Sequence, residues 1–179
     1  MSDIEYEAKA LGIDPVDIAR RIVAAGGVEA APARVMRRYV YDTVPPVPGR
    51  WVRLRDMGSV VTLCVKEIST DAVDGTRETE VTVDDFVGTA ELLRLAGLTP
   101  RGYQENRRTS YTLGPVRLEI DEWPRIPPYL EIEADDEAQV WEAAAALGLD
   151  RDGLTSVNTT KIYRLYGIDL EVIADLRFE

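Results

Sequence analysis

The chain has 179 residues, 45% of them hydrophobic, which is enough to build the core of one folded domain over residues 1–179. Its formal net charge of −11 argues against nucleic acid as a general partner, because phosphate backbones attract basic surfaces. Histidine is absent, which excludes Ser-His-Asp and Cys-His nucleophiles and histidine-based zinc sites, so any catalysis must use carboxylates, Lys, Arg, Tyr or a metal bound by oxygen.

The sequence also argues against a membrane or an oxidising compartment. Cys64 is the only cysteine, so an intrachain disulfide is impossible. No basic segment followed by an apolar one opens the chain, and no apolar run approaches the roughly 20 residues that span a bilayer. We therefore expect a cytoplasmic protein without a membrane partner, either a monomer or a homodimer.

The first predicted strand, around residues 4–9, carries charge on one face only. A strand points alternate side chains to opposite sides, so Glu5, Glu7 and Lys9 share a surface. An isolated pair of glutamates at this spacing is usually the solvated side of a strand. Here the same spacing returns near the other end of the chain, at Glu131 and Glu133, which suggests a common site.

After this strand, the first half of the chain predicts a helix, four strands and a second helix. Pro15 suits the first turn of a helix, and Gly26-Gly27 ends it. The expected strands cover residues 35–42, 51–55, 60–67 and 77–83. The second helix covers residues 84–96 and offers for burial Phe86, Leu92, Leu93 and Leu95.

The second half repeats this layout loosely. Strands are expected at residues 102–106, 109–113, 116–121 and 129–134. A helix over residues 136–147 ends at Gly148, and a short helix near 158–166 precedes an extended tail. The shared order of a Glu-x-Glu-Ala strand and a helix closed by glycine indicates a weak internal pseudo-repeat.

Several of these strands have one apolar face and one charged face. Arg53 and Arg55 alternate with Val52 and Leu54. Charges in other strands lie at Lys66, Glu78, Glu80, Arg117, Glu119 and Asp121. An open sheet with a solvated side would hold more Thr, Ser and Gln at such positions. A barrel with its apolar faces outward, covered by helices, would instead gather the charges in a polar lumen.

Such a lumen requires a ligand. Two carboxylates about 6 Å apart repel by roughly 3 kcal/mol at an effective dielectric near 20. An inward-facing acidic cluster therefore needs bound cations, and a cluster of Arg and Lys needs an anion. A polyphosphate with a divalent metal satisfies both needs.

The charged motifs occur in a specific order along nearly the whole chain. They are Glu5-x-Glu7-x-Lys9, Val52-Arg53-Leu54-Arg55, Val65-Lys66, Arg77-Glu78-Thr79-Glu80, Arg108, Asp121 and Leu130-Glu131-Ile132-Glu133. This ordered set resembles the CYTH superfamily, also called the triphosphate tunnel metalloenzymes. The resemblance implies an α+β fold in which an eight-stranded antiparallel β-barrel, flanked by helices and open at both ends, holds a triphosphate.

The resemblance also implies roles for individual residues. The metal, Mg²⁺ or Mn²⁺, would be held by Glu5, Glu7, Glu131 and Glu133, with Glu80 and Asp121 as further candidates. The phosphate binders would be Lys9, Arg55, Lys66 and Arg108, with Arg53 and Arg117 as further candidates. Lys9, Arg55 and Lys66 would also be catalytic, because they would stabilise the charge on the transferring group.

Two places depart from the family pattern. Asn106 stands where members commonly have Lys, and Arg107 compensates only if it turns inward. The run from Arg38 to Asp42 replaces an acidic-x-Tyr-aromatic-Asp run. These changes affect the choice of substrate more than the fold. Packing is the expected role of the three tryptophans, Trp51, Trp123 and Trp141.

Three functions are compatible with this pattern. The first is a metal-dependent hydrolase of tripolyphosphate, nucleoside triphosphate or thiamine triphosphate. The second is a class IV adenylyl cyclase, which converts ATP to cyclic AMP and pyrophosphate in the same lumen. The third is a non-catalytic module that binds polyphosphate or nucleotide, although binding an anion alone would not require four clustered glutamates.

Overall fold

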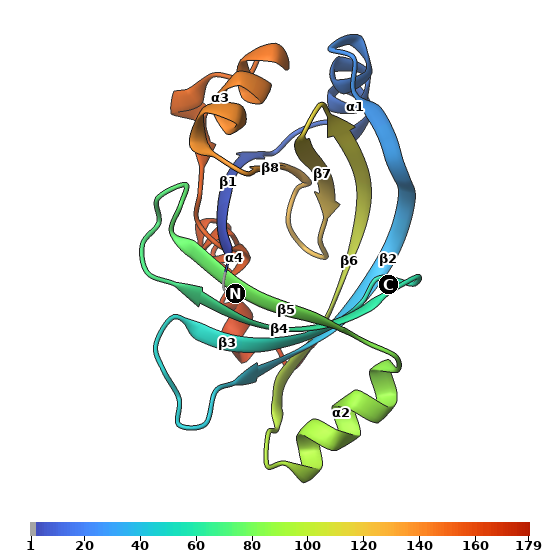
Figure 1. Cartoon of the computed structure of the whole chain (residues 1–179), viewed down its shortest axis with the longest axis vertical. Coiled ribbons are helices and arrows are strands. Elements are labelled where there is room, and N and C mark those ends of the chain that lie inside the picture. The colour runs from blue at the N-terminus through green and yellow to red at the C-terminus, as the bar shows by residue number, and fades with distance from the viewer. Residues whose placement is uncertain (1–2) are drawn as a thin grey trace.

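The computed structural model describes residues 3–179, and its centre is a closed β-barrel (Figure 1). Strands pair in the order β6, β2, β3, β4, β5, β1, β8, β7, and β7 pairs with β6 to close the ring. Every pair in the ring is antiparallel. The strands are β1 (Asp3–Leu11), β2 (Val28–Asp42), β3 (Arg50–Asp56), β4 (Val61–Ile68), β5 (Thr76–Val83), β6 (Pro100–Leu113), β7 (Val116–Glu122) and β8 (Tyr129–Ala134). The predicted eight-stranded antiparallel barrel is confirmed.

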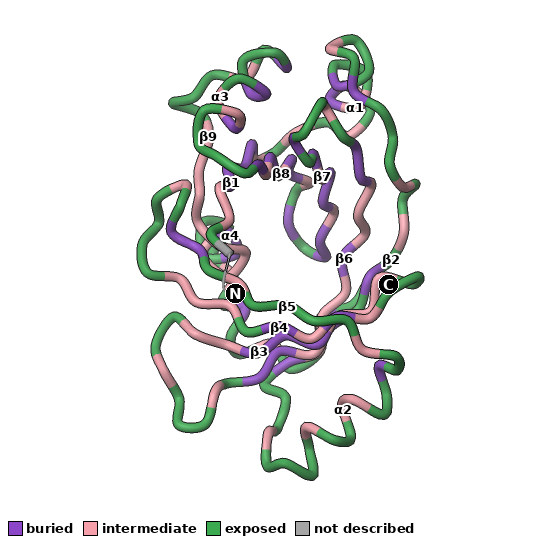
Figure 2. The backbone as a smooth tube through the Cα atoms, in the orientation of Figure 1, coloured by how far each residue is buried: buried purple, intermediate pink, exposed green. Residues whose placement is uncertain are grey.

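Alternation along each strand sorts side chains between the outside and the lumen. On β1, Ala8 and Ala10 belong to the core outside the barrel, whereas Glu7 and Lys9 line the lumen. On β8, Ile132 lies outside and Glu131 inside in the same way. Buried residues gather on β7 and β8 and around β3 and β4 (Figure 2). The apolar core of this protein therefore surrounds the barrel, and the interior is left polar.

Helices cover this outer apolar surface in two places. α1 (Pro15–Ala24) and α3 (Glu137–Ala146) share a core with β1, β7 and β8, while α2 (Phe86–Leu95) lies at the opposite end of the molecule (Figure 1). Asp14 begins α1 by accepting hydrogen bonds from the amides of the first turn, at 2.8 and 2.9 Å. Phe86 of α2 packs in a separate core with Tyr41, Val52 and Leu54.

The C-terminal segment packs against the loop between β7 and β8. It consists of a 3₁₀ turn, η1 (Arg151–Gly153), β9 (Leu154–Thr155), α4 (Thr159–Leu165), a second 3₁₀ turn, η2 (Leu170–Val172), and β10 (Asp175–Leu176). Ile162 and Tyr163 of α4 share a core with Trp123 and Tyr129. The Tyr163 hydroxyl donates a 2.6 Å hydrogen bond to the carbonyl of Pro124. β9 pairs with β1, and β10 runs parallel to β6.

Three local predictions were wrong. Residues 102–106 and 109–113 form one strand, β6, because its ladder continues through Arg107 and Arg108 to both β2 and β7. β2 begins at Val28 rather than at residue 35, since irregular pairing between residues 29 and 34 accommodates Pro32. In α2, Leu92 and Leu95 are exposed, whereas Phe86 and Leu93 face the core together with Ala90.

Among residues 3–179, no helix combines the length and the apolar character that crossing a membrane requires.

Candidate active site

The barrel encloses one large cavity of about 1120 Å³ with a strongly charged lining. Sequence prediction named twelve site residues, and eleven of them line this cavity: Glu5, Glu7, Lys9, Arg53, Arg55, Lys66, Glu80, Arg108, Arg117, Glu131 and Glu133. The twelfth, Asp121, is fully buried behind them. The alternation that places their side chains on one face of each strand thus brings them together in one space, while their chemical roles stay predictions.

Carboxylates gather on one side of the cavity, which we call the acidic wall: Glu5, Glu7, Glu119, Glu131 and Glu133, from β1, β7 and β8. Glu7 lies directly opposite Glu133 on the neighbouring strand, and Glu119 lies directly opposite Glu131. Like charges in such cross-strand positions repel. One oxygen of Glu119, Oε2, is buried without a hydrogen-bond partner, and burial raises the pKa of this carboxyl.

Arginines gather on the side formed by β2, β3 and β6, which we call the basic wall: Arg38, Arg53, Arg55 and Arg108. Arg38 lies directly opposite Arg55 in the ladder between β2 and β3. Arg53 is balanced by Glu78 at 2.7 Å and Glu80 at 3.1 Å. Arg55 is compensated less well, because its ion pair with Glu80 measures 3.4 Å. Burial and then the charges of Arg53 and Arg108 lower the pKa of Arg55 to about 10.

Two lysines stand among the acids. Lys9 is 2% exposed, and its Nζ lies 3.0 Å from Glu7 and 3.5 Å from Glu131. Lys66 lies 2.7 Å from both Glu5 and Glu78. Burial and Arg53 would lower the pKa of Lys66, but these two carboxylates outweigh them and raise it. Both lysines are therefore protonated cations inside the tunnel.

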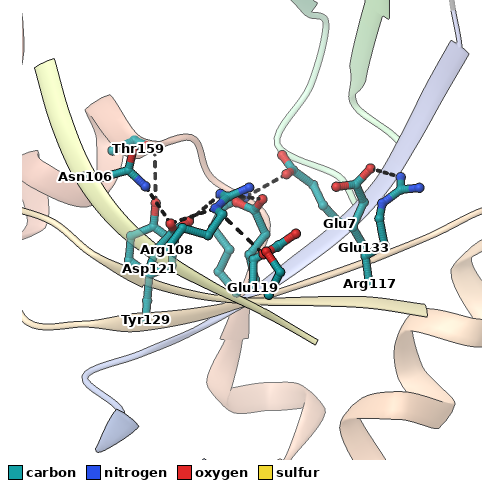
Figure 3. Close-up of polar contacts among 12 residues, drawn as sticks. Glu7, Asn106, Arg108, Arg117, Glu119, Asp121, Tyr129, Glu133 and Thr159 are labelled. Carbon is teal, nitrogen blue, oxygen red and sulfur yellow. Dashed lines mark hydrogen bonds and ion pairs between the residues drawn. The ribbon is translucent and has the colours of Figure 1, made fainter. Parts of the chain in front are cut away.

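Arg108 is fixed by the buried Asp121 (Figure 3). Its Nε donates to Oδ1 of Asp121 at 2.8 Å, and its Nη2 lies 3.3 Å from Glu131. Asn106 also donates to Asp121, at 2.7 Å. Because both oxygens of Asp121 accept hydrogen bonds from these donors and Asp121 does not line the cavity, its geometry suits the positioning of Arg108 better than the binding of a metal.

Some lining residues lie near solvent. The side chain of Arg117 is 55% exposed and forms an ion pair with Glu133 (Figure 3). Glu80 is 33% exposed.

Trp51 lines the cavity on the same face of β3 as Arg53, so it is not only a packing group as the sequence predicted.

The acidic wall fits a divalent cation such as Mg²⁺ or Mn²⁺. Its donors are all carboxylate oxygens, which these ions prefer, and Glu119 Oε2 accepts no hydrogen bond, although Nε of Arg108 lies 4.0 Å away. A second group, Cys64, Glu78 and Glu80, offers ligand atoms within 4.8 Å of one another. It fits less well in its donor chemistry, because burial raises the pKa of the Cys64 thiol to about 12, whereas the acidic wall offers carboxylates alone.

Sequence reasoning missed Arg38 as a site residue and named Glu119 only as part of a charged strand face. Both lie on lumen faces by simple alternation, Arg38 four residues before Asp42 and Glu119 two before Asp121. Arg107 does not turn inward: it pairs with Glu122 at 3.3 Å and lies over the ring of Phe178. It therefore cannot supply the charge that Asn106 lacks.

Comparisons with solved structures show the same fold in other proteins. A conserved hypothetical protein from Pyrococcus furiosus matches with a TM-score of 0.73 and 21% identity, over 87% of this chain and 97% of its own. A Vibrio parahaemolyticus protein proposed to be an adenylate cyclase matches with a TM-score of 0.77 and 13% identity, over 92% and 99%. A Hippeastrum protein, proposed as an adenylyl cyclase and described as having a dominant triphosphatase activity, matches with a TM-score of 0.60 and 15% identity, over 96% and 99%.

At these identities the structures establish the fold alone, and none of the curated proteins matches the sequence. The family model of the CYTH domain matches residues 3–166, which include every strand of the barrel. The chain therefore belongs to the CYTH family, whose members are metal-dependent enzymes that bind triphosphate substrates.

Proposed function

We propose that this protein is a metal-dependent triphosphatase. The observation that carries the proposal is the sign of the charges that face each other across neighbouring strands. Glu7 opposes Glu133 and Glu119 opposes Glu131 on the acidic wall, whereas Arg38 opposes Arg55 on the basic wall. Facing charges of like sign repel each other; Lys9, Arg108 and Arg117 offset part of this repulsion on the acidic wall, and a ligand of the opposite sign relieves the rest. A triphosphate together with a divalent cation supplies both signs in one bound species.

The basic residues would bind and orient the phosphate chain. Lys9, Arg55, Lys66 and Arg108 all line the cavity, and each offers N–H donors to phosphate oxygens. Arg53 stands beside Arg55 but is held by two glutamates, and Arg117 is half exposed, so both would contribute less. Arginine suits this task because its planar fork can donate two parallel hydrogen bonds to one phosphate group.

Glu5, Glu7, Glu131 and Glu133 would hold the Mg²⁺ or Mn²⁺ ion, with Glu119 as an additional donor. Glu80 is farther toward solvent and paired with arginines. When bound, the metal supplies positive charge to the phosphate oxygens.

The tunnel residues would promote attack of water on the terminal phosphorus. The bond from phosphorus to the water oxygen forms as the bond to the leaving diphosphate breaks, and the water proton passes to a carboxylate of the acidic wall. The basic wall holds the charge that shifts to the leaving oxygens. Positioning and charge stabilisation are thus the two contributions expected from the side chains.

Product analysis tests the proposal. The purified protein is incubated separately with tripolyphosphate, thiamine triphosphate and ATP in the presence of Mg²⁺ or Mn²⁺, and the products are separated by ion-exchange chromatography. We expect orthophosphate from tripolyphosphate at a rate at least equal to that with ATP, and ADP with phosphate from ATP. Cyclic AMP and pyrophosphate as the main products would instead establish a cyclase. Tight binding without turnover of any triphosphate would establish a binding module.

A further inference from the structure

Arg38 is a buried cation that no carboxylate neutralises. The residue is 8% exposed, lies in the second half of β2 and lines the cavity. Among the side chains that the structure describes, it forms no ion pair within 4.0 Å, and its only side-chain hydrogen bond goes to the neutral Oδ1 of Asn106. Its Nε is buried without a partner. A buried guanidinium in this state is costly unless an anion joins it.

The surroundings orient Arg38 without reducing its charge. Its guanidinium lies 4.6 Å from the centre of the Trp123 ring, and Trp123 is itself packed against Tyr163 of α4. Asn106 donates to Asp121 at 2.7 Å (Figure 3). Because a carboxylate only accepts, the amide oxygen of Asn106 is left to accept the hydrogen bond from Arg38. Asp121 forms no ion pair with Arg38 within 4.0 Å, and its oxygens accept hydrogen bonds from Arg108 and Asn106.

A second poorly compensated arginine stands directly opposite. Arg55 is the partner of Arg38 in the ladder between β2 and β3, and both side chains line the cavity. The Nε of Arg55 is also buried without a hydrogen-bond partner. Burial and then the charges of Arg53, Arg55 and Arg108 lower the pKa of Arg38 to about 9. Two like charges held side by side in this way are preorganised for a shared anion.

We propose that Arg38 and Arg55 together bind one phosphate group of the substrate, so that Arg38 is a substrate-binding residue on the basic wall. The inference rests on the proposed function, because it takes the ligand of the tunnel to be a phosphate chain. It adds to that function a site on β2, with Trp123 and Asn106 as the residues that position the guanidinium.

Calorimetric titration of inorganic tripolyphosphate into the protein, with EDTA and again with Mg²⁺, measures this contact directly. Arg38→Gln should weaken binding by about 10- to 100-fold in both conditions, since a charge-assisted hydrogen bond is lost while the side chain can still reach Asn106. Arg37→Gln is the matched control. Arg37 directly precedes Arg38 on β2, is exposed and pairs with Asp56 on the outside of the barrel. Its substitution should therefore leave the affinity for tripolyphosphate unchanged. Arg38→Lys should keep part of the affinity, because it keeps the charge but loses the fork.

A shared phosphate also predicts coupling and a specific effect on stability. The loss of affinity in Arg38→Gln with Arg55→Gln should be smaller than the product of the two single losses. Without anion, Arg38→Gln should melt at or above the wild-type temperature, because a buried like-charge contact is removed, and tripolyphosphate should raise its melting temperature less than it raises that of the wild type.

The possible failures are distinguishable. Equal affinity in Arg38→Gln and wild type, or equal losses in Arg38→Gln and Arg37→Gln, would overturn the Arg38 site while the triphosphatase proposal stands. A lower melting temperature in Arg38→Gln with an undiminished response to tripolyphosphate would show a structural role and overturn the site too. A wild-type protein that does not bind tripolyphosphate in either condition would overturn the proposed function itself.

Discussion

Glutamine at Glu5 or at Glu131 tests the acidic wall, because the two carboxyl groups stand in opposite electrostatic situations. Burial raises the pKa of Glu5 from 4.5 to about 8, although Lys66 lies 2.7 Å away. Burial acts in the same direction on Glu131, but there the charges of Lys9 and Arg108 win and lower its pKa to about 2. The fold therefore disfavours the ionised form of Glu5 and favours the ionised form of Glu131.

The two substitutions should thus change stability in opposite directions. One unit of pKa corresponds to about 1.4 kcal/mol, so Glu131→Gln should lower the free energy of unfolding by up to about 3 kcal/mol. Glu5→Gln should raise it by about 1 to 3 kcal/mol at pH 8, less than the full shift implies because Lys66 loses one of its two partners. For a chain of this size, each kcal/mol moves the melting temperature by about 2 to 4 °C.

Activity should fall in both variants, by about 100-fold or more, because each removes a proposed metal ligand. Thermal melts in EDTA and tripolyphosphate hydrolysis at limiting Mg²⁺ are measured on the same samples. Glu91→Gln, on the exposed surface of α2, is the control for losing a carboxylate and should change neither quantity much. Full activity in either site variant at limiting Mg²⁺ would refute its role in metal binding. Shifts of the same sign in stability would refute the electrostatic argument.

Three further predictions follow from the geometry. In the metal-free protein, the free energy of unfolding should fall as the pH rises from about 5 to about 8, because the folded state keeps a proton on Glu5 that the unfolded state has released. Thermal melts over this range should show a smaller dependence of stability on pH in Glu5→Gln than in the wild type. Equal dependence in the two proteins would contradict the assignment. Arg108→Ala should reduce kcat/KM by about one to two orders of magnitude. Arg107→Ala is the control and should not reduce it, because the side chain of Arg107 lies outside the lumen. Equal losses in the two variants would show that the net charge of the protein matters rather than the position of Arg108 in the lumen. Cys64 should resist alkylation at pH 8 in the native protein, since burial raises the pKa of its thiol to about 12, and mass spectrometry showing rapid modification would contradict this.

Much of the barrel was predictable from the sequence, because a strand alternates its side chains whatever its partners are. That rule correctly assigned Arg53 and Arg55 to one face of β3, and Glu131 and Glu133 to one face of β8. The closure of the sheet into an eight-stranded barrel was predicted from the resemblance of the ordered motifs to a known family, because alternation alone does not specify closure. Local patterns were less informative where tertiary pairing decides. Nothing near Arg107 reveals that β6 runs on without a turn, and the leucines of α2 do not show which of them will meet the barrel.

The positions of the charges around the lumen could not be predicted, because they depend on the register between strands. Most facing pairs carry opposite signs, as at Lys66 and Glu78 or at Arg108 and Asp121, and such pairs would serve a barrel that used its lumen charges for stability alone. The exceptions that line the cavity have like signs: glutamates oppose glutamates on the acidic wall, and on the other side of the cavity Arg38 opposes Arg55 and Arg34 opposes Arg108. Packing requires neither arrangement, and like charges in facing positions repel each other. Glu131 and Glu133 also face Lys9 and Arg117, which offset part of their repulsion. Arg38 faces Arg55 on one neighbouring strand and the uncharged Gln104 on the other. The register therefore identifies Arg38, which the sequence marked only as a departure from the family pattern, as a lumen charge that requires an anion.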